Sequence, residues 1–161
     1  MAWRFFKKKA TIEEDKINHY VPLQPIEYSS MVILAWAKAI EGNTDLQNWL
    51  KENGYPELYF TVFAIYLKDE PRKWLINNGY AHLFAMIHAA EGNEKASKWL
   101  LDNNFEMLYH LAKAVDHENE SWLWLRKNAS PDLFVLAKSI QFIKDKIEER
   151  HNDMHSINKD L

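Results

Sequence analysis

Few side chains in this chain have the types and spacing that catalysis or metal binding needs. His151 and His155 stand at i and i+4, which would place both imidazoles on one face of a helix, but no third ligand lies near them in the sequence. His88 and Glu91 are spaced as an acid–base pair, yet no nucleophile or oxyanion donor accompanies them. Because the chain also lacks cysteine, we expect no metal site, no cofactor, no catalytic residue and no enzymatic activity.

Charge and hydropathy narrow the classes of partner. The formal net charge is −3, whereas a nucleic-acid-binding protein normally carries a basic face, so we expect no nucleic acid. The lysines Lys7–Lys9 follow an aromatic segment, Trp3–Phe6, and this stretch would either touch an anionic membrane or form a solvated tail. No apolar run reaches the roughly 18 residues of a membrane span, and none resembles a secretory signal. The sequence therefore predicts a cytoplasmic protein.

A tryptophan recurs four times at a spacing of 25 residues, which reveals an internal repeat. Each tryptophan is followed by leucine at the next position, by asparagine four positions on and by another leucine nine positions on. The tryptophans could form an exposed ladder that stacks bases or sugars, but their fixed place beside leucine favours a core. We predict that the structural core of the repeat consists of Trp49, Trp74, Trp99, Trp124, Leu58, Leu83, Leu108 and Leu133.

Each repeat reads as two helices joined by a tight turn. A short helix, such as 45–53, precedes a longer one, such as 56–67, whose apolar residues have the spacing of a buried face. Asn and Gly at the breaks tolerate the left-handed backbone that ends a helix. We therefore predict an all-α fold: a right-handed α-solenoid of four 25-residue helix–turn–helix repeats with N- and C-terminal caps. The breaks lie at 53–55, 78–80, 103–105 and 128–130.

Both ends of such an array need covering. The capping box Thr11–Glu14 predicts a short helix, and the prolines within 20–25 predict extended chain, so we expect residues 1–25 to form an N-terminal arm that folds over the first stack. The repeat domain would span 26–150, because the last helix continues through Ile143 and Ile147 to about Arg150. Residues 151–161 are polar and are expected to be a C-terminal tail.

The stretch 89–104 resembles the helical part of an ankyrin repeat. It carries Ala89-Ala90, a Gly92-Asn93 turn and a Leu-Leu pair before an Asn-rich break, and 39–43 repeats the turn. The Thr-Pro-Leu-His signature and the β-hairpin of that family are absent, and the period is 25 rather than about 33 residues. The resemblance implies a helical stack used for protein binding. A divergent α-helical solenoid of its own kind is the alternative.

Some solvent-facing positions of the repeat hold aromatic residues in one copy and mostly small or polar residues in the others. In that copy Phe60, Phe63 and Tyr66 form an aromatic stripe. Such a stripe is typical of a partner site, although the N-terminal arm could instead cover it. The polar residues at the same positions could shape a docking surface or form an ordinary solvated face. The predicted partner-binding residues are Phe60, Phe63, Tyr66, His88, Lys113 and Asp116.

The function that these patterns favour is a protein–protein interaction module built from stacked helical repeats, with an unknown protein partner. The motivation is that core positions stay constant between copies while solvent-facing positions differ. An immunity or antitoxin-type protein that binds a toxin is one alternative. An enzyme or a nucleic-acid binder is the other.

Overall fold

The computed structural model describes residues 26–157, and the side chains of residues 26–154. Within that range every regular element is an α-helix, which confirms the predicted all-α class. None of the described helices is long and apolar enough to cross a membrane. The helices are α2 (Ser30–Ile40), α3 (Thr44–Glu52), α4 (Pro56–Ile65), α5 (Asp69–Asn77), α6 (Ala81–Ala90), α7 (Glu94–Asp102), α8 (Glu106–Val115), α9 (Asn119–Asn128) and α10 (Pro131–Ile157).

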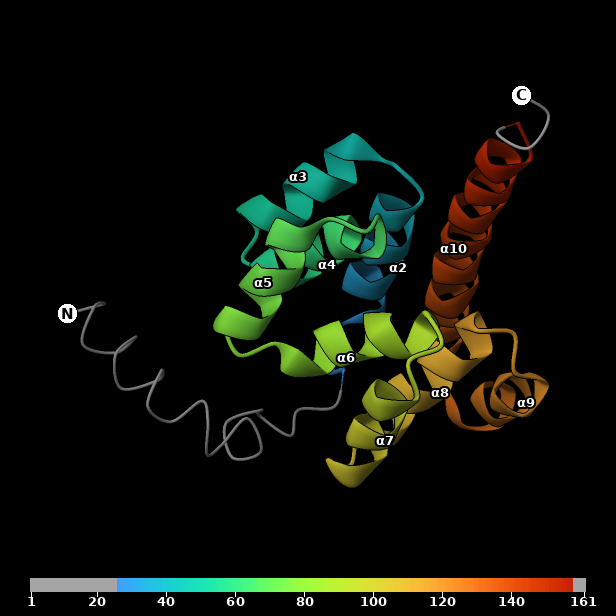
Figure 1. The fold of residues 1–161 in the computed structure, drawn as a ribbon. Helices are drawn as coiled ribbons and strands as arrows, with labels where there is room; N and C mark the ends of the chain where they lie inside the picture. The colour runs from blue at the N-terminus through green and yellow to red at the C-terminus, as the bar shows by residue number, and fades with distance from the viewer. Residues whose placement is uncertain (1–25, 158–161) are drawn as a thin grey trace.

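The helices alternate between an inner and an outer layer. The even-numbered inner helices supply most of the buried core, because apolar side chains occupy more than one face of each. The odd-numbered outer helices are polar apart from a short stripe around the repeat Trp-Leu pair. Each outer helix packs against the inner helix before it, and α3, α5 and α7 also pack against the one after it (Figure 1).

The asparagine of the repeat ends each outer helix. Its side-chain amide donates to the carbonyl of the repeat tryptophan four residues earlier, at 2.8 Å from Asn53 to Trp49 and at similar distances in the other three copies. The chain then turns through a residue of positive φ in the first three copies. In the first three copies the same tryptophan carbonyl also accepts the backbone N–H of that asparagine, so the side chain adds a second hydrogen bond at the last turn of the helix. The positive-φ residues are Gly54, Gly79 and Asn104.

The leucines of the repeat form the centre of the core, and the tryptophans pack around it. The leucine after each tryptophan and the predicted core leucines are buried. The four repeat indoles are half-buried and pack against the core. Trp49, Trp74 and Trp99 each stack on the aromatic ring six residues later in the chain, with ring centroids 5.8–6.0 Å apart. The indoles therefore fasten the outer helices to the turns that follow them.

The first and last described helices pack against each other. Each inner helix contacts the next, and α10 contacts both α8 and α2, so the five inner helices close into a circuit (Figure 1). The Ser139 hydroxyl on α10 donates to Glu41, which follows α2, at 2.6 Å. α10 also runs past the expected end at Arg150 to Ile157. The right-handed solenoid stays a prediction, and the N-terminal arm 1–25 lies outside the described residues.

Candidate protein-binding surface and central charge cluster

An open groove lies between α4 and α5 and is lined by aromatic side chains. Phe60 stacks on Trp74 with ring centroids 4.1 Å apart and an interplanar angle of 22°. Tyr59 meets Phe60 and Phe63 edge-on, at 5.3 and 4.9 Å. The hollow measures about 730 Å³, and we call it the aromatic groove. Its lining residues are Tyr59, Phe60, Phe63, Lys68, Glu70, Pro71, Lys73, Trp74, Asn77 and Asn78.

The rim of the aromatic groove is positively charged. Lys68 and Lys73 are exposed, and the Lys51 ammonium lies 5.4 Å from the centroid of the Tyr59 ring. The one carboxylate of the lining, Glu70, pairs with Lys73 at 3.1 Å, and both side chains are largely in solvent. An exposed pair of this kind is weak, so neither group is committed to the other. Among the lining residues themselves, the ammonium groups of Lys68 and Lys73 stand against the single carboxylate of Glu70.

The structure brings together only two of the six predicted partner-binding residues. Phe60 and Phe63 line the aromatic groove. The hydroxyl of Tyr66 donates to the carbonyl of Ile40 at 2.7 Å, and burial raises the pKa of that phenol. Tyr66 therefore links α4 to the end of α2.

The other three predicted residues lie outside the groove. His88 packs on Phe84 and lies 3.2 Å from an Arg72 nitrogen. Lys113 pairs with Glu94 at 3.2 Å. Asp116 is exposed at the end of α8. These three residues take part in separate contacts and do not line the aromatic groove.

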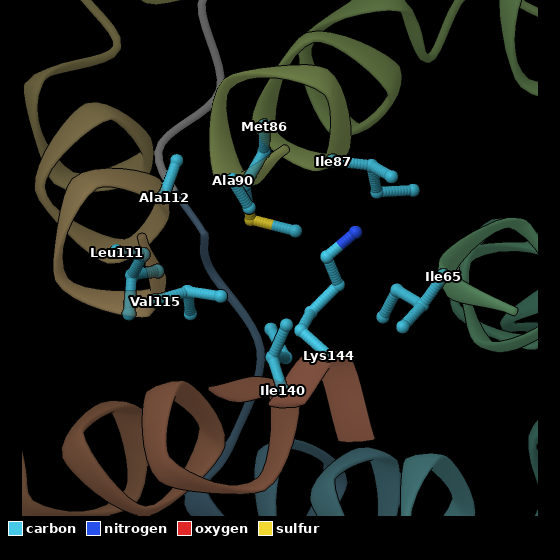
Figure 2. Close-up of a pocket in the computed structure, with 9 residues that line it drawn as sticks. All are labelled: Ile65, Met86, Ile87, Ala90, Leu111, Ala112, Val115, Ile140 and Lys144. Atoms are coloured by element: carbon cyan, nitrogen blue, oxygen red, sulfur yellow. The ribbon is translucent and has the colours of Figure 1, made fainter. Parts of the chain in front are cut away.

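A buried lysine reaches the centre of the inner circuit. Lys144 extends from α10 between Ile65 and Ile87 into a cavity that is otherwise lined by apolar side chains (Figure 2). Its side chain is 8% exposed, and its ammonium lies 3.2 Å from a carboxylate oxygen of Glu91. The cavity leaves about 10 Å³ for the centre of a water-sized sphere, which is room for about one water. The cavity has no space for a substrate or cofactor beside Lys144.

Glu91 also binds the guanidinium of Arg72. Arg72 donates to both oxygens of the Glu91 carboxylate, and its Nε donates to the carbonyl of Ala64 at 3.0 Å. Burial acts to raise the pKa of Glu91, but the Arg72 hydrogen bond and the Lys144 charge outweigh it and lower that pKa. α4, α6 and α8 all end beside the cavity, so the negative ends of their dipoles face the ammonium. We call Arg72, Glu91 and Lys144 the central charge cluster.

The suggested acid–base pair forms no direct hydrogen bond, and the suggested metal-binding pair lies partly outside the described side chains. The His88 ring is hydrogen-bonded to Arg72 rather than to Glu91. His151 is exposed on α10, and the side chain of His155 lies outside the described residues. Among the described residues, no three His, Cys, Asp or Glu side chains gather as metal ligands.

Sequence reasoning missed several residues of both sites. The repeat pattern predicts that Trp74 belongs to the core and gives Tyr59 no binding role, because spacing alone does not show which ring edges stay open. Lys144 did carry a signal, since it stands at i+4 from the buried Ile140 and interrupts an apolar register. Arg72 carried no signal, because its partner lies on the following inner helix.

Comparison of the chain with protein-family models, with curated proteins and with solved structures found no match. The ankyrin resemblance therefore stays a prediction from the residues quoted for it.

Proposed function

We propose that this protein is an interaction module whose aromatic groove binds an acidic peptide segment of a protein partner through an aromatic or apolar anchor residue. The observation that supports this proposal is the groove itself: four aromatic side chains, all only half-buried, beside exposed lysines. Tryptophan and tyrosine contribute most to binding energy at protein interfaces. An open aromatic hollow on a chain of ordinary polarity is typical of a docking site.

The aromatic floor favours a peptide anchor. Phe60 and Trp74 stack in parallel, so their faces are taken by each other, whereas the edges of Tyr59 and Phe63 close one side of the hollow. A planar or branched apolar side chain would fill that space. Asn77 is exposed at the groove, and its amide can bond the backbone of an extended peptide.

The charged rim favours an acidic partner. Lys51, Lys68 and Lys73 surround the hollow, and carboxylates flanking the anchor residue would meet them at the edge of the contact. Charges at a rim act mainly on the association rate and on specificity, so binding should weaken as salt rises. The frame that presents the groove is, in this proposal, a right-handed α-solenoid of four helix–turn–helix units in the cytoplasm.

A selection from a random peptide library tests the proposal. We expect the selected peptides to combine an aromatic or large apolar residue with several Asp or Glu. The variant Lys68→Glu/Lys73→Glu should weaken binding of a selected peptide by about tenfold or more, because these lysines are solvated and their reversal leaves the core intact.

The control uses the next repeat. Lys98 stands 25 residues after Lys73, and Lys95 is exposed on the same outer helix, so Lys95→Glu/Lys98→Glu makes the same change of charge on the next outer helix, away from the groove. Binding by this control should be unchanged, and circular dichroism should show all three proteins folded alike. Equal weakening by both double variants, or a selection without acidic peptides, would contradict the proposal.

A further inference from the structure

The outer layer has an open position at the junction of α10 and α2. These two helices pack against each other, as every pair of neighbouring inner helices does. At the α2–α4, α4–α6 and α6–α8 junctions an outer helix packs on both partners. Among the described helices, none packs in this way on both α10 and α2.

Equivalent residues of the inner helices, spaced 25 apart and including Val135, show that α10 lacks a neighbour in the outer layer here. Residues at this register meet the outer helix that follows: Phe60 stacks on Trp74, and His110 stacks on Trp124 at 4.0 Å. The small residues at the same register in α2 and α6 are buried. Val135 stands at that register in α10 and is 39% exposed.

A second set of equivalent residues, which includes Leu34, shows that α2 also lacks a neighbour in the outer layer here. Residues at this register meet the outer helix that precedes them, as Phe134 meets Trp122 with ring centroids 5.1 Å apart. In α4, α6, α8 and α10 the residue here is aromatic and half-buried. Leu34 stands at that register in α2 and is 43% exposed. Met31 and Phe142 are also exposed on these two helices. We call Met31, Leu34, Val135 and Phe142 the open junction.

Exposed lysines stand on both helices of the open junction. Lys138 lies 3.9 Å from the centroid of the Trp122 ring, and Lys146 lies 4.1 Å from that of Phe142. Lys38 pairs with Glu41 at 2.6 Å, and the Asp132 carboxylate of α10 lies beside Ser30 of α2. An occupant of this position would therefore be a short, partly apolar helix, and acidic groups on it could pair with the exposed lysines.

We propose that residues 12–20 of this chain dock at the open junction as the fifth outer helix, with Thr11 as their N-cap. This segment has nine residues, the length of α3, α5 and α7, and its capping box predicts helix. It carries three acidic residues in Glu13–Asp15, which complement the exposed lysines. The residues that would continue the repeat by register, 19–27, cannot form this helix, because Pro22 and Pro25 fall inside it.

The repeat also predicts which side chain enters the position. In all four outer helices the sixth residue is the repeat tryptophan, and in α5 and α9 this tryptophan stacks on the residue equivalent to Val135. The sixth residue of 12–20 is Ile17. The remaining chain, 21–29, spans up to about 30 Å, enough to connect the docked helix to α2.

Disulfide cross-linking tests this placement directly, because the chain has no cysteine of its own. The pair Ile17→Cys/Val135→Cys should form an intramolecular disulfide under mild oxidation. It should do so at least about tenfold faster than Ile17→Cys/Leu101→Cys, whose second site is an exposed leucine on α7. Non-reducing mass spectrometry separates intramolecular from intermolecular products. Equal rates would overturn the proposal, and intermolecular disulfides alone would assign the junction to a second copy.

Hydrogen exchange on a full-length single variant gives a second measure that needs no cross-link. Ile17→Asp should raise amide exchange in the α10 segment around Val135 by about tenfold or more, while α6 stays unchanged. Unchanged exchange around Val135 would mean that residues 12–20 do not cover the junction, which would overturn the proposal. Neither measurement involves the aromatic groove, so this inference and the proposed function can fail separately.

Discussion

At the scale of single residues, the turns after the inner helices show how backbone conformation selects side chains. The chain turns through positive φ at 42, 67, 92 and 117, one repeat apart. Two copies use glycine, but Leu67 and His117 adopt φ of 64° and 67°. A β-carbon in this region costs about 1 kcal/mol or more, so these two copies hold local strain.

Leu67→Gly should relieve that strain and stabilise the protein by about 0.5 kcal/mol. The gain is limited because glycine also loses more backbone entropy on folding, and because the substitution removes the buried part of a leucine that is only 44% exposed. Gly92→Ala should change stability in the opposite direction by about 1 kcal/mol, since φ there is 84°. Urea unfolding gives the sign of the change in unfolding free energy for each variant. A destabilised Leu67→Gly protein would contradict the proposed strain at Leu67.

His82 makes stability depend on pH. It is buried against the Phe105 ring, its Nδ1 has no hydrogen-bond partner among the described residues, and burial lowers the pKa of His82 to about 4. The unfolded chain, with a histidine pKa near 6.5, binds a proton first, so stability is full above about pH 6.5 and falls as pH drops towards 4. The loss should be on the order of 2–3 kcal/mol.

Urea midpoints between pH 7.5 and pH 5 measure this effect. The control is His82→Leu, which keeps an apolar group of similar size and removes the titration. Its midpoint should change less over the same range, where the carboxylates are still ionised. If His82→Leu kept the full slope, other groups would be responsible.

At the scale of helices, capping residues help to explain where the outer helices begin. Asn43 and Asn93 precede α3 and α7, and each side chain accepts from the backbone N–H three residues on, at 3.0 Å. α5 and α9 begin at Lys68 and Glu118 without a side-chain cap. Alternate outer helices are thus capped differently at their starts.

Asn93→Ala should destabilise the protein by about 1 kcal/mol, because the first turn of α7 loses an acceptor for the Ala96 N–H. The control is Lys95→Ala, which lies in the same turn and is exposed. Chemical unfolding should show a clearly smaller loss of stability for Lys95→Ala. Equal losses would indicate that stability responds to any substitution in this turn and not to the cap.

Helix positions were largely predictable, since the signals for them are local. The breaks at 53–55, 78–80 and 103–105 agree with the observed ends, because Asn and Gly at those sites tolerate the left-handed backbone that ends a helix. The end of α10 was not predictable, because a polar helix without a terminating Gly or Pro has no local stop signal. The aromatic groove was half-predictable: the pattern identified Phe60 and Phe63, but neighbouring helices decide which edges stay open.

At the scale of the whole molecule, the decisive feature is the contact between α2 and α10. The hydrogen bond from Ser139 to Glu41 joins residues 98 positions apart. No periodic pattern encodes such a contact, because an open array and a closed one use the same repeat. Closure follows from the accumulated rotation between units, which depends on side-chain packing throughout the inner layer.

Closure should make the ends of the array as protected as its middle. In an open array the terminal helices exchange amide hydrogens faster than central ones, since they lose contacts on one side only. Here the protected amides of α2 and α6 should exchange with similar free energies of opening, measured by hydrogen exchange with mass spectrometry. Exchange in α2 that is faster than in α6 by orders of magnitude would mean that the circuit opens readily at the α2–α10 junction.

Removing different charges of the central charge cluster should change the stability of the protein by different amounts. Glu91→Gln would leave Lys144 and Arg72 without their shared carboxylate, and a buried unpaired charge costs about 3–5 kcal/mol. Lys144→Met should cost only about 1 kcal/mol, because Arg72 still pairs with Glu91 and the methionine fills an apolar cavity. The double variant Glu91→Gln/Lys144→Met should then be more stable than Glu91→Gln alone. A double-mutant cycle of unfolding free energies in urea measures this difference. If Lys144→Met were the more damaging substitution, the ammonium would act on the converging helix ends rather than on Glu91, and the circuit would be stabilised by helix dipoles instead of an ion pair.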